Sequence, residues 1–383
     1  ILILLLLAGG TVVLVDPFFH YHAPLNSLAY TIDNAAYQNP GIAKHYTYDS
    51  AILGSSVTFD FAPSQFAETM GITTVKLSMG DANMKMLAKT AEQVLNSKNN
   101  VKTIFYGLDH WSLARNPDTL STALPEYLWD DNPFNDVEYI FNKSVLTASV
   151  GDVLKNTLNG GHTTTQDEAH AEAASLYCRE SVALARFYEE KLQNMADPGT
   201  FDESVALENT RRNLEENLLP IIDANPETTF TVFLPPLSIL YWYDWMQSKD
   251  LNTALDMLDM AAETLLARPN VQLYNFMAQS AITCNLDYYY DEIQAAPAVH
   301  TYRTNCFASG ENRVTTDTWP AHRDAILQMV EDFDFGTLYG GTYPFKQEET
   351  VEGWLNALNA TGGLDTGRYT LLMAIQPGEG WPG

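Results

Sequence analysis

Basic residues are scarce in this chain of 383 amino acids. Lysine and arginine together number 21, against 48 aspartate and glutamate residues, which gives a formal net charge of −27. A protein with this charge is repelled by nucleic acid and by anionic membrane surfaces. We therefore expect no nucleic-acid partner. The hydrophobic share of 46% is that of an ordinary globular protein with enough apolar side chains for a sizeable core.

Cysteine is equally scarce, and its spacing argues against the common structural metal sites. The three cysteines are Cys178, Cys284 and Cys306. None belongs to a CxxC pair or to a Cys/His cluster with zinc spacing, so we expect no structural metal. A disulfide between Cys284 and Cys306 remains open at this stage.

Charge is absent altogether from the first fifteen residues, "ILILLLLAGGTVVLV". This run is short for a bilayer span, which needs about 20 residues, and a buried strand is the alternative interpretation. We interpret residues 1–15 as a clipped N-terminal membrane anchor and residues 16–48 as a juxtamembrane segment. The rest of the chain would then lie outside the cytoplasm, attached to a bacterial cell membrane.

The residues that follow alternate between strand and helix patterns. Short apolar runs predict strands, and longer runs with helical spacing predict helices. This alternation predicts an α/β fold with a doubly wound, mainly parallel sheet of five strands. The predicted strands are "SAILGS" (50–55), "TTVKLS" (73–78), "VKTIFYGL" (101–108), "TFTVFLPP" (229–236) and "VQLYNFMA" (271–278).

Two stretches depart from this alternation. Residues 111–225 have helical patterns throughout, which predicts a helical insertion within a main domain of residues 49–312. Residues 313–383 contain a helix near "PAHRDAILQMVEDF", a turn rich in glycine and tyrosine, a second helix and a last strand at 369–375. We interpret them as a C-terminal α/β extension that is truncated at its end.

The first predicted strand ends in a glycine and two hydroxyl residues, Gly54-Ser55-Ser56. Glycine has no Cβ, so the chain can turn sharply after the strand. A serine after such a turn can act as a nucleophile. Alternatively, Ser55 and Ser56 cap the helix that begins near Pro63.

Further candidates follow the other strands. Gly80 comes after the second strand, Asp109 in "GLDHW" after the third, and Asp291 in "NLDYYYDEIQ" after the fifth. Because the ends of parallel strands share one edge of the sheet, we expect these residues to converge where α/β proteins bind their ligands. A hydroxyl, backbone N–H donors and a carboxylate are the parts of an acyl-transfer site.

The order of these short motifs resembles the SGNH (GDSL-like) hydrolase superfamily, and within it membrane-anchored bacterial cell-surface members of the AlgX-like and DltD-like kind. The resemblance covers roughly residues 12–310. It is carried by "DPFFHYHAPL", "YQNPGIAKHYTYDSAILGSSV", "GLDHW", "YLWDDNPFNDVEYIFNKSVL" and "LPPLSILYW". It implies a flavodoxin-like SGNH fold with neither a metal nor an organic cofactor.

The resemblance also implies roles for single residues. Ser56 stands in the place of the nucleophile, with Ser55 before it, and Gly80 would supply an oxyanion-hole N–H. Asp109 stands where many members have an asparagine. This is a departure, because a carboxyl group donates a hydrogen bond only when it is protonated.

The closing Asp-x-x-His motif of the family is incomplete here. Asp291 matches its acid, but Gln294 occupies the place of the histidine that takes the proton of the serine. Glutamine is not a base, and loss of a triad member costs several powers of ten in rate. His110, next to Asp109, is the better-placed replacement, because helical spacing would put His300 nearly two turns beyond Gln294.

Two functions from different classes follow from these residues. The first is an extracytoplasmic esterase or O-acyltransferase that acts on acyl groups of a cell-surface glycan or polymer through Ser56. The resemblance implies a membrane-bound O-acyltransferase as its partner. The alternative is a catalytically inactive binding or scaffolding subunit of an acylation or export complex in the cell envelope, which Gln294 favours.

Overall fold

The computed structural model describes residues 2–171, 177–196 and 201–338. Its centre is a mixed sheet of six strands in the order β2-β1-β3-β4-β5-β6. The first five strands are parallel, and β6 is antiparallel to β5. The strands are β1 (Ser50–Leu53), β2 (Thr74–Lys76), β3 (Thr103–Gly107), β4 (Thr229–Leu234), β5 (Val271–Asn275) and β6 (Arg313–Val314).

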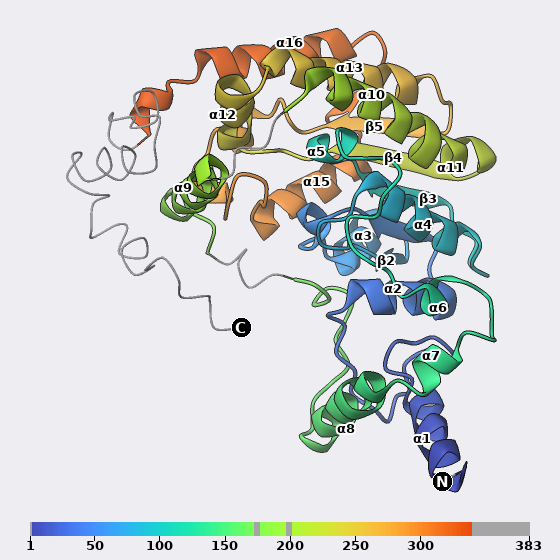
Figure 1. The fold of residues 1–383 in the computed structure, drawn as a ribbon. Helices are drawn as coiled ribbons and strands as arrows, with labels where there is room; N and C mark the ends of the chain where they lie inside the picture. Colours follow the sequence, from blue (N-terminus) through green and yellow to red (C-terminus); the bar gives the residue numbers. More distant parts are fainter. Residues whose placement is uncertain (1, 172–176, 197–200, 339–383) are drawn as a thin grey trace.

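Helices cover both faces of this sheet (Figure 1). The longer ones are α1 (Leu2–Val15), α2 (Ala35–His45), α3 (Pro63–Met70), α4 (Met84–Leu95), α8 (Val150–Leu158), α9 (Glu180–Ala196), α10 (Glu203–Arg212), α12 (Ile239–Ser248), α13 (Leu251–Leu266), α15 (Pro297–Ser309) and α16 (Trp319–Asp332). The shorter ones are α5 (His110–Leu113), α6 (Glu126–Trp129), α7 (Val137–Ile140), α11 (Leu219–Ala224) and α14 (Ser280–Thr283). The 3₁₀-helical turns are η1 (Ser56–Thr58), η5 (Leu286–Tyr288) and η6 (Phe335–Thr337). The wider, π-helical turns are η2 (Val145–Ser149) and η4 (Asn213–Leu218).

The strands are apolar because both faces of the sheet are buried, as parallel sheets require. Side chains on one face join an aromatic cluster with α3 and α15. Those on the other face join the main core with α2, α4 and α13. The members of the smaller cluster are Ile52, Phe61, Phe66, Phe105, Phe233, Tyr274, Phe276, Cys306 and Phe307.

The α/β class and the five parallel strands predicted from the sequence are confirmed. The number of strands is corrected to six, because Arg313 and Val314 pair with Tyr274 and Leu273 along the edge of β5. Helix α16 then packs on α13, where Asp259 accepts hydrogen bonds from Trp319 and Arg323. Residues 313–338 thus continue the main sheet and its helical layer, and the turn, helix and strand expected further on lie outside the described residues.

The segment 16–48 contains a helix, α2, that the sequence analysis does not predict. Pro40 lies inside this helix, and its neighbour Asn39 donates from Nδ2 to the carbonyl oxygen of Leu77, 3.0 Å away. Ile42 and Ala43 are fully buried. The segment is therefore packed into the body of the protein, directly beside the chain that leaves β2.

Two further findings bear on the sequence expectations. All three cysteines are free thiols, so the Cys284–Cys306 disulfide is not formed. Cys306 is buried on α15 and accepts a hydrogen bond from Asn312. In the part of the chain that the structure describes, no helix is both long and apolar enough to cross a membrane.

We predict that Gly41→Ala destabilises the protein. An added Cβ would meet the backbone carbonyl groups of Phe18 and Phe19, which cannot move without the turn they belong to. We expect a loss of about 1–3 kcal/mol in the free energy of unfolding, the usual cost of overpacking. Gly151→Ala is the matched control, since that helical position has no atom within 4 Å of the new Cβ. Urea titration measures the stability of both variants. Equal changes in the two would contradict a steric clash at position 41.

Candidate functional site

The turn after β1 lies at the carboxyl edge of the sheet, between the ends of β2 and β3. Strand order reverses at this point, where α/β proteins form their ligand crevice. Ser55 ends the extended chain and caps the short turn η1, because its Oγ accepts the N–H of Val57 at 3.4 Å. Ser56 is the first residue of the turn and is half-buried. Its hydroxyl has no hydrogen-bond partner among the described residues.

The position of Thr58 accounts for two glycines, Gly54 before this turn and Gly107 at the end of β3. Its hydroxyl donates to Ser78 Oγ at 2.6 Å, which fixes the turn to the chain after β2. Its methyl group fills the space beside Gly54 and Gly107, where any Cβ would collide with it. Gly54 is thus required for this close packing, and its φ is not positive.

Gly80 is exposed beside the same turn, with the ring of Phe59 3.6 Å from where its Cβ would be. Its N–H makes no hydrogen bond within the described ranges. The next residue, Asp81, forms an ion pair with Arg115 at 2.6 Å. The loop after β2 and the loop after α5 are joined in this way, next to the end of β3.

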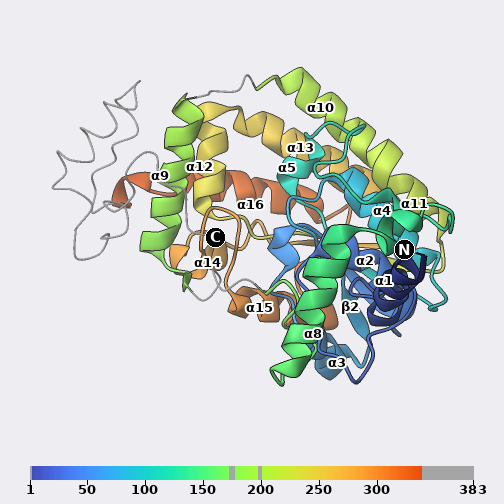
Figure 2. The same cartoon turned by 60° about the horizontal axis from the view of Figure 1, so that its bottom comes forward.

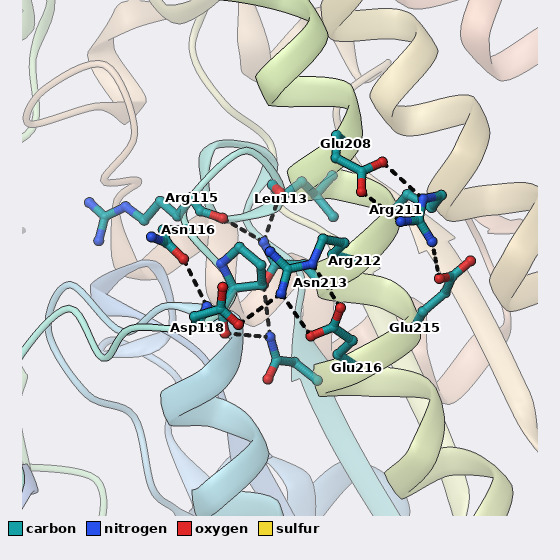
Figure 3. Close-up of polar contacts among 12 residues, drawn as sticks. Leu113, Arg115, Asn116, Asp118, Glu208, Arg211, Arg212, Asn213, Glu215 and Glu216 are labelled. Carbon is teal, nitrogen blue, oxygen red and sulfur yellow. Dashed lines mark hydrogen bonds and ion pairs between the residues drawn. The ribbon is translucent and has the colours of Figure 1, made fainter.

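The Arg115 loop is in turn fixed by the helical insertion (Figure 3). Asn213, at the start of the wide turn η4, donates from Nδ2 to the carbonyl oxygens of Leu113 and Arg115 at 2.9 and 2.8 Å. Arg212 donates to Asp118 at 2.8 Å. Wide helical turns of this kind often occur near functional sites, because they redirect side chains within a helix.

Asp109 is the fully buried carboxyl group of the site. It precedes α5 but makes no capping hydrogen bond, and neither of its oxygens accepts a well-formed hydrogen bond from the described residues. Burial raises the pKa of this carboxyl from 3.8 to about 7, although the nearby Ser55 hydroxyl and the guanidinium groups of Arg115 and Arg303 oppose the shift. Asp109 is therefore substantially protonated at neutral pH.

Helix α15 attaches to the serine turn through the carbonyl oxygen of Val57. His300 Nε2 lies 3.0 Å from this oxygen, and Arg303 Nη2 donates to it at 3.2 Å. The Arg303 guanidinium stacks over the rings of Phe61 and Phe233, at 4.5 and 5.5 Å from their centroids. Its Nε and Nη1 lack hydrogen-bond partners in the described residues, and burial lowers its pKa to about 9.

The imidazoles of the region are engaged with other groups. Nδ1 of His110 lies 2.7 Å from Tyr241 Oη and its Nε2 lies 3.0 Å from Ala254 O, in a packed aromatic environment. His300 has carbonyl oxygens near both nitrogens, since Nδ1 lies 3.3 Å from Ala296 O. Burial lowers the pKa of both rings, so they are neutral. Neither ring makes a hydrogen bond to a serine hydroxyl of the described residues.

Asp291 and Gln294 belong to the loop between η5 and α15. Asp291 Oδ1 accepts the N–H groups of Ile293 and Gln294 at 2.8 and 2.6 Å, so this carboxylate shapes its own loop. Burial raises its pKa, and these N–H groups oppose the shift. Burial raises the pKa of the Cys178 thiol, and the charges of Asp60, four residues after Ser56, and of Asp291 raise it further. A direct approach of Asp291 to Ser56 stays a prediction.

Sequence reasoning missed the contribution of α15. It set His300 aside by counting helical turns from Gln294, but the helix begins only at Pro297. Arg303 received no role, although it lies one helical turn from His300 on the same face. A sequence signal does exist, because Arg303 is the one Lys, Arg, Asp or Glu residue in "PAVHTYRTNCFAS" (297–309), within a chain that has few basic residues.

A metal site finds no support in the described residues, which contain no group of three or more His, Cys, Asp or Glu side chains arranged to hold an ion. Comparison with protein-family models, curated proteins and solved structures finds no match to this chain. Function must therefore be argued from the residues themselves.

We predict that Asp109 contributes a component of wild-type stability that falls as the pH rises from about 4 to 7, opposite in sign to the contribution of the buried neutral rings of His110 and His300. In this window the unfolded chain has ionised Asp109 while the folded chain retains the proton, so the unfolded state binds fewer protons. The effect reaches about 4 kcal/mol for a shift of this size. Asp109→Asn should remove this component, whereas Asp256→Asn, at an exposed position on α13, should leave it in place. Urea unfolding at several pH values measures the difference, and equal pH slopes for all three proteins would refute a protonated Asp109.

Proposed function

We propose that this protein is an extracytoplasmic, SGNH-like acyl esterase or O-acyltransferase that acts on a cell-surface glycan or polymer. The proposal includes attachment to a bacterial membrane by the N-terminal segment and a membrane-bound O-acyltransferase as partner. The observation that carries the enzymatic part is the Ser55-Ser56 turn, which lies at the edge where strand order reverses, beside a buried carboxyl group.

In this proposal the Ser56 hydroxyl attacks the carbonyl carbon of an acyl ester. The serine proton passes to solvent, and solvent protonates the leaving oxygen as the ester C–O bond breaks and the alcohol departs. The acyl group remains on Ser56 until water or a glycan hydroxyl attacks its carbonyl carbon, loses a proton to solvent and releases Ser56, whose oxygen regains a proton from solvent. The Gly80 N–H is available to the oxygen that becomes negative in the transition state, because it has no other partner in the described part of the chain.

In its protonated, neutral form, Asp109 adds a second hydrogen-bond donor to the oxyanion site that the Gly80 N–H begins. Its position corresponds to the asparagine donor of the resembled family, and its protonated form can donate a hydrogen bond in the same way. The Ser55 hydroxyl and the titratable groups of Tyr106, Arg115, Tyr241 and Arg303 interact electrostatically with it. An apolar site that keeps an acid protonated at neutral pH is an established means of making such a donor.

The second function, an inactive binding or scaffolding subunit, is favoured by a specific observation. The imidazoles of His110 and His300 lie against a tyrosine hydroxyl and backbone carbonyl groups, and Gln294 stands in the place of the general base. A serine without a base reacts slowly. The two functions therefore differ in whether Ser56 reacts at all.

We predict that a fluorophosphonate probe labels the wild-type protein at Ser56. Ser56→Ala should abolish labelling, whereas Ser64→Ala, an exposed serine on α3, should label like the wild type. Gln294→His should raise turnover of p-nitrophenyl acetate by supplying the missing base. Absence of labelling in correctly folded wild-type and Gln294→His proteins would reject the enzyme and favour the scaffold.

The pH dependence of labelling tests the role of Asp109. Hydroxide accelerates any serine reaction, so the informative quantity is the labelling rate of wild type divided by that of Asp109→Asn at each pH. We expect this ratio to fall by roughly tenfold or more as the pH rises through 7, because the wild-type donor is lost and a negative charge appears. A ratio that rises through pH 7 would instead identify Asp109 as a base.

A further inference from the structure

Exposed apolar side chains are concentrated at one end of the molecule. Of the sixteen large hydrophobic side chains exposed in the described residues, thirteen lie on α1 or within residues 134–158, and three lie elsewhere. Helices α1, α7 and α8 stand together at this end, away from the sheet (Figures 1 and 2). We name this assembly of residues 2–15 and 134–158 the apolar end.

The first two turns of helix α1 expose apolar side chains on every side, whereas Gly9, Val12 and Val15 further along the helix are buried. Leu2, Ile3 and Leu4 are 70%, 73% and 70% exposed, and Leu6 and Leu7 are 64% and 63% exposed. Successive residues of a helix point about 100° apart, so these side chains surround the axis. A protein partner on one side would cover only a stripe of such a helix, whereas lipid hydrocarbon surrounds it.

The neighbouring segment extends this surface beyond α1. Phe134 before α7 and Leu158 at the end of α8 are each 87% exposed, and Val137 and Phe141 are each 53% exposed. Phe141 also lies against α1, because its ring would be 3.2 Å from a Cβ at Gly9. The two segments, far apart in sequence, thus meet at this end of the molecule, where each exposes several apolar side chains.

The apolar end is fixed to the body by a buried carboxylate. Asp16 follows α1, and its oxygens accept the N–H groups of His20, Tyr21 and His22 at 2.8–3.0 Å. The hydroxyl of Tyr139, on α7, donates to the same carboxylate at 2.8 Å. The Asp16 carboxylate therefore connects both α1 and α7 to the turn that follows α1. For this reason, α1 and α7 cannot change their orientations independently.

We propose that the whole apolar end, and not α1 alone, contacts a lipid bilayer, with the side chains of Phe134 and Leu158 entering the hydrocarbon. This inference rests on the membrane attachment in the proposed function and adds a second, sequence-distant contact. The lipid surface is zwitterionic, because α1 carries no charge and a protein with net charge −27 gains nothing from anionic headgroups.

Tryptophan substitutions test this contact in the full chain. Leu158→Trp places a fluorophore at the proposed contact, and Val205→Trp, on α10, is the matched control at an exposed apolar position elsewhere. The emission added by each tryptophan is obtained by subtracting the wild-type spectrum. With phosphatidylcholine vesicles brominated on the acyl chains, we expect at least twofold quenching of the residue at 158 and none at 205.

Flotation and sedimentation complete the experiment. The protein should float with phosphatidylcholine vesicles, and added phosphatidylserine should not increase the bound fraction. Flotation without quenching at position 158 would show that α1 alone enters the membrane and would overturn the proposal. A stable dimer that neither floats nor is quenched would overturn it too, since a second copy would then cover the surface. Neither outcome depends on whether the probe labels Ser56. The membrane-contact inference can therefore fail while the enzymatic proposal holds, and the reverse is also true.

Discussion

The carbonyl oxygen of Val57 joins the two parts of the candidate site. It belongs to the turn that carries Ser55 and Ser56, and it lies within hydrogen-bonding distance of a ring nitrogen of His300 and a guanidinium nitrogen of Arg303. Both side chains come from α15, about 245 residues later in the chain. Together with the packing of α15 on α3, this attachment fixes the position of α15, and so of the loop that carries Asp291 and Gln294, relative to the serines. The resulting arrangement brings a buried arginine and a buried carboxyl group to the same turn.

Much of the sheet could be predicted from the sequence, and the reason is physical. Each central strand is buried on both faces, so it appears as an uninterrupted apolar run bounded by glycine, proline or polar residues. Helix α2 could not be predicted in this way, because Pro40 within it is a strong signal against a helix. Strand β6 has only two residues and exists only because the edge of β5 is available to it.

The candidate site was predictable only in part. Strand ends identified Gly54, Gly80 and Asp109, because their position depends on topology alone. The orientation of a side chain depends on tertiary contacts, and the spacing of apolar residues in the sequence does not show these contacts. Thus His110, adjacent to Asp109 in the chain, lies against Tyr241 and Ala254, while His300 reaches the serine turn from a distant helix. The protonation of Asp109 likewise follows from its burial, which a sequence does not show.

Within residues 2–171, 177–196 and 201–338, the two edge strands of the sheet are short, and this limits how that sheet can pair with another chain. One margin is the three-residue strand β2, where the N–H of Lys76 is already bonded to Gln166. The other is the two-residue strand β6. Short margins of this kind give an incoming chain little backbone to pair with. The described sheet therefore offers little template for strand-by-strand aggregation, even though the N-terminal helix carries many uncovered leucines.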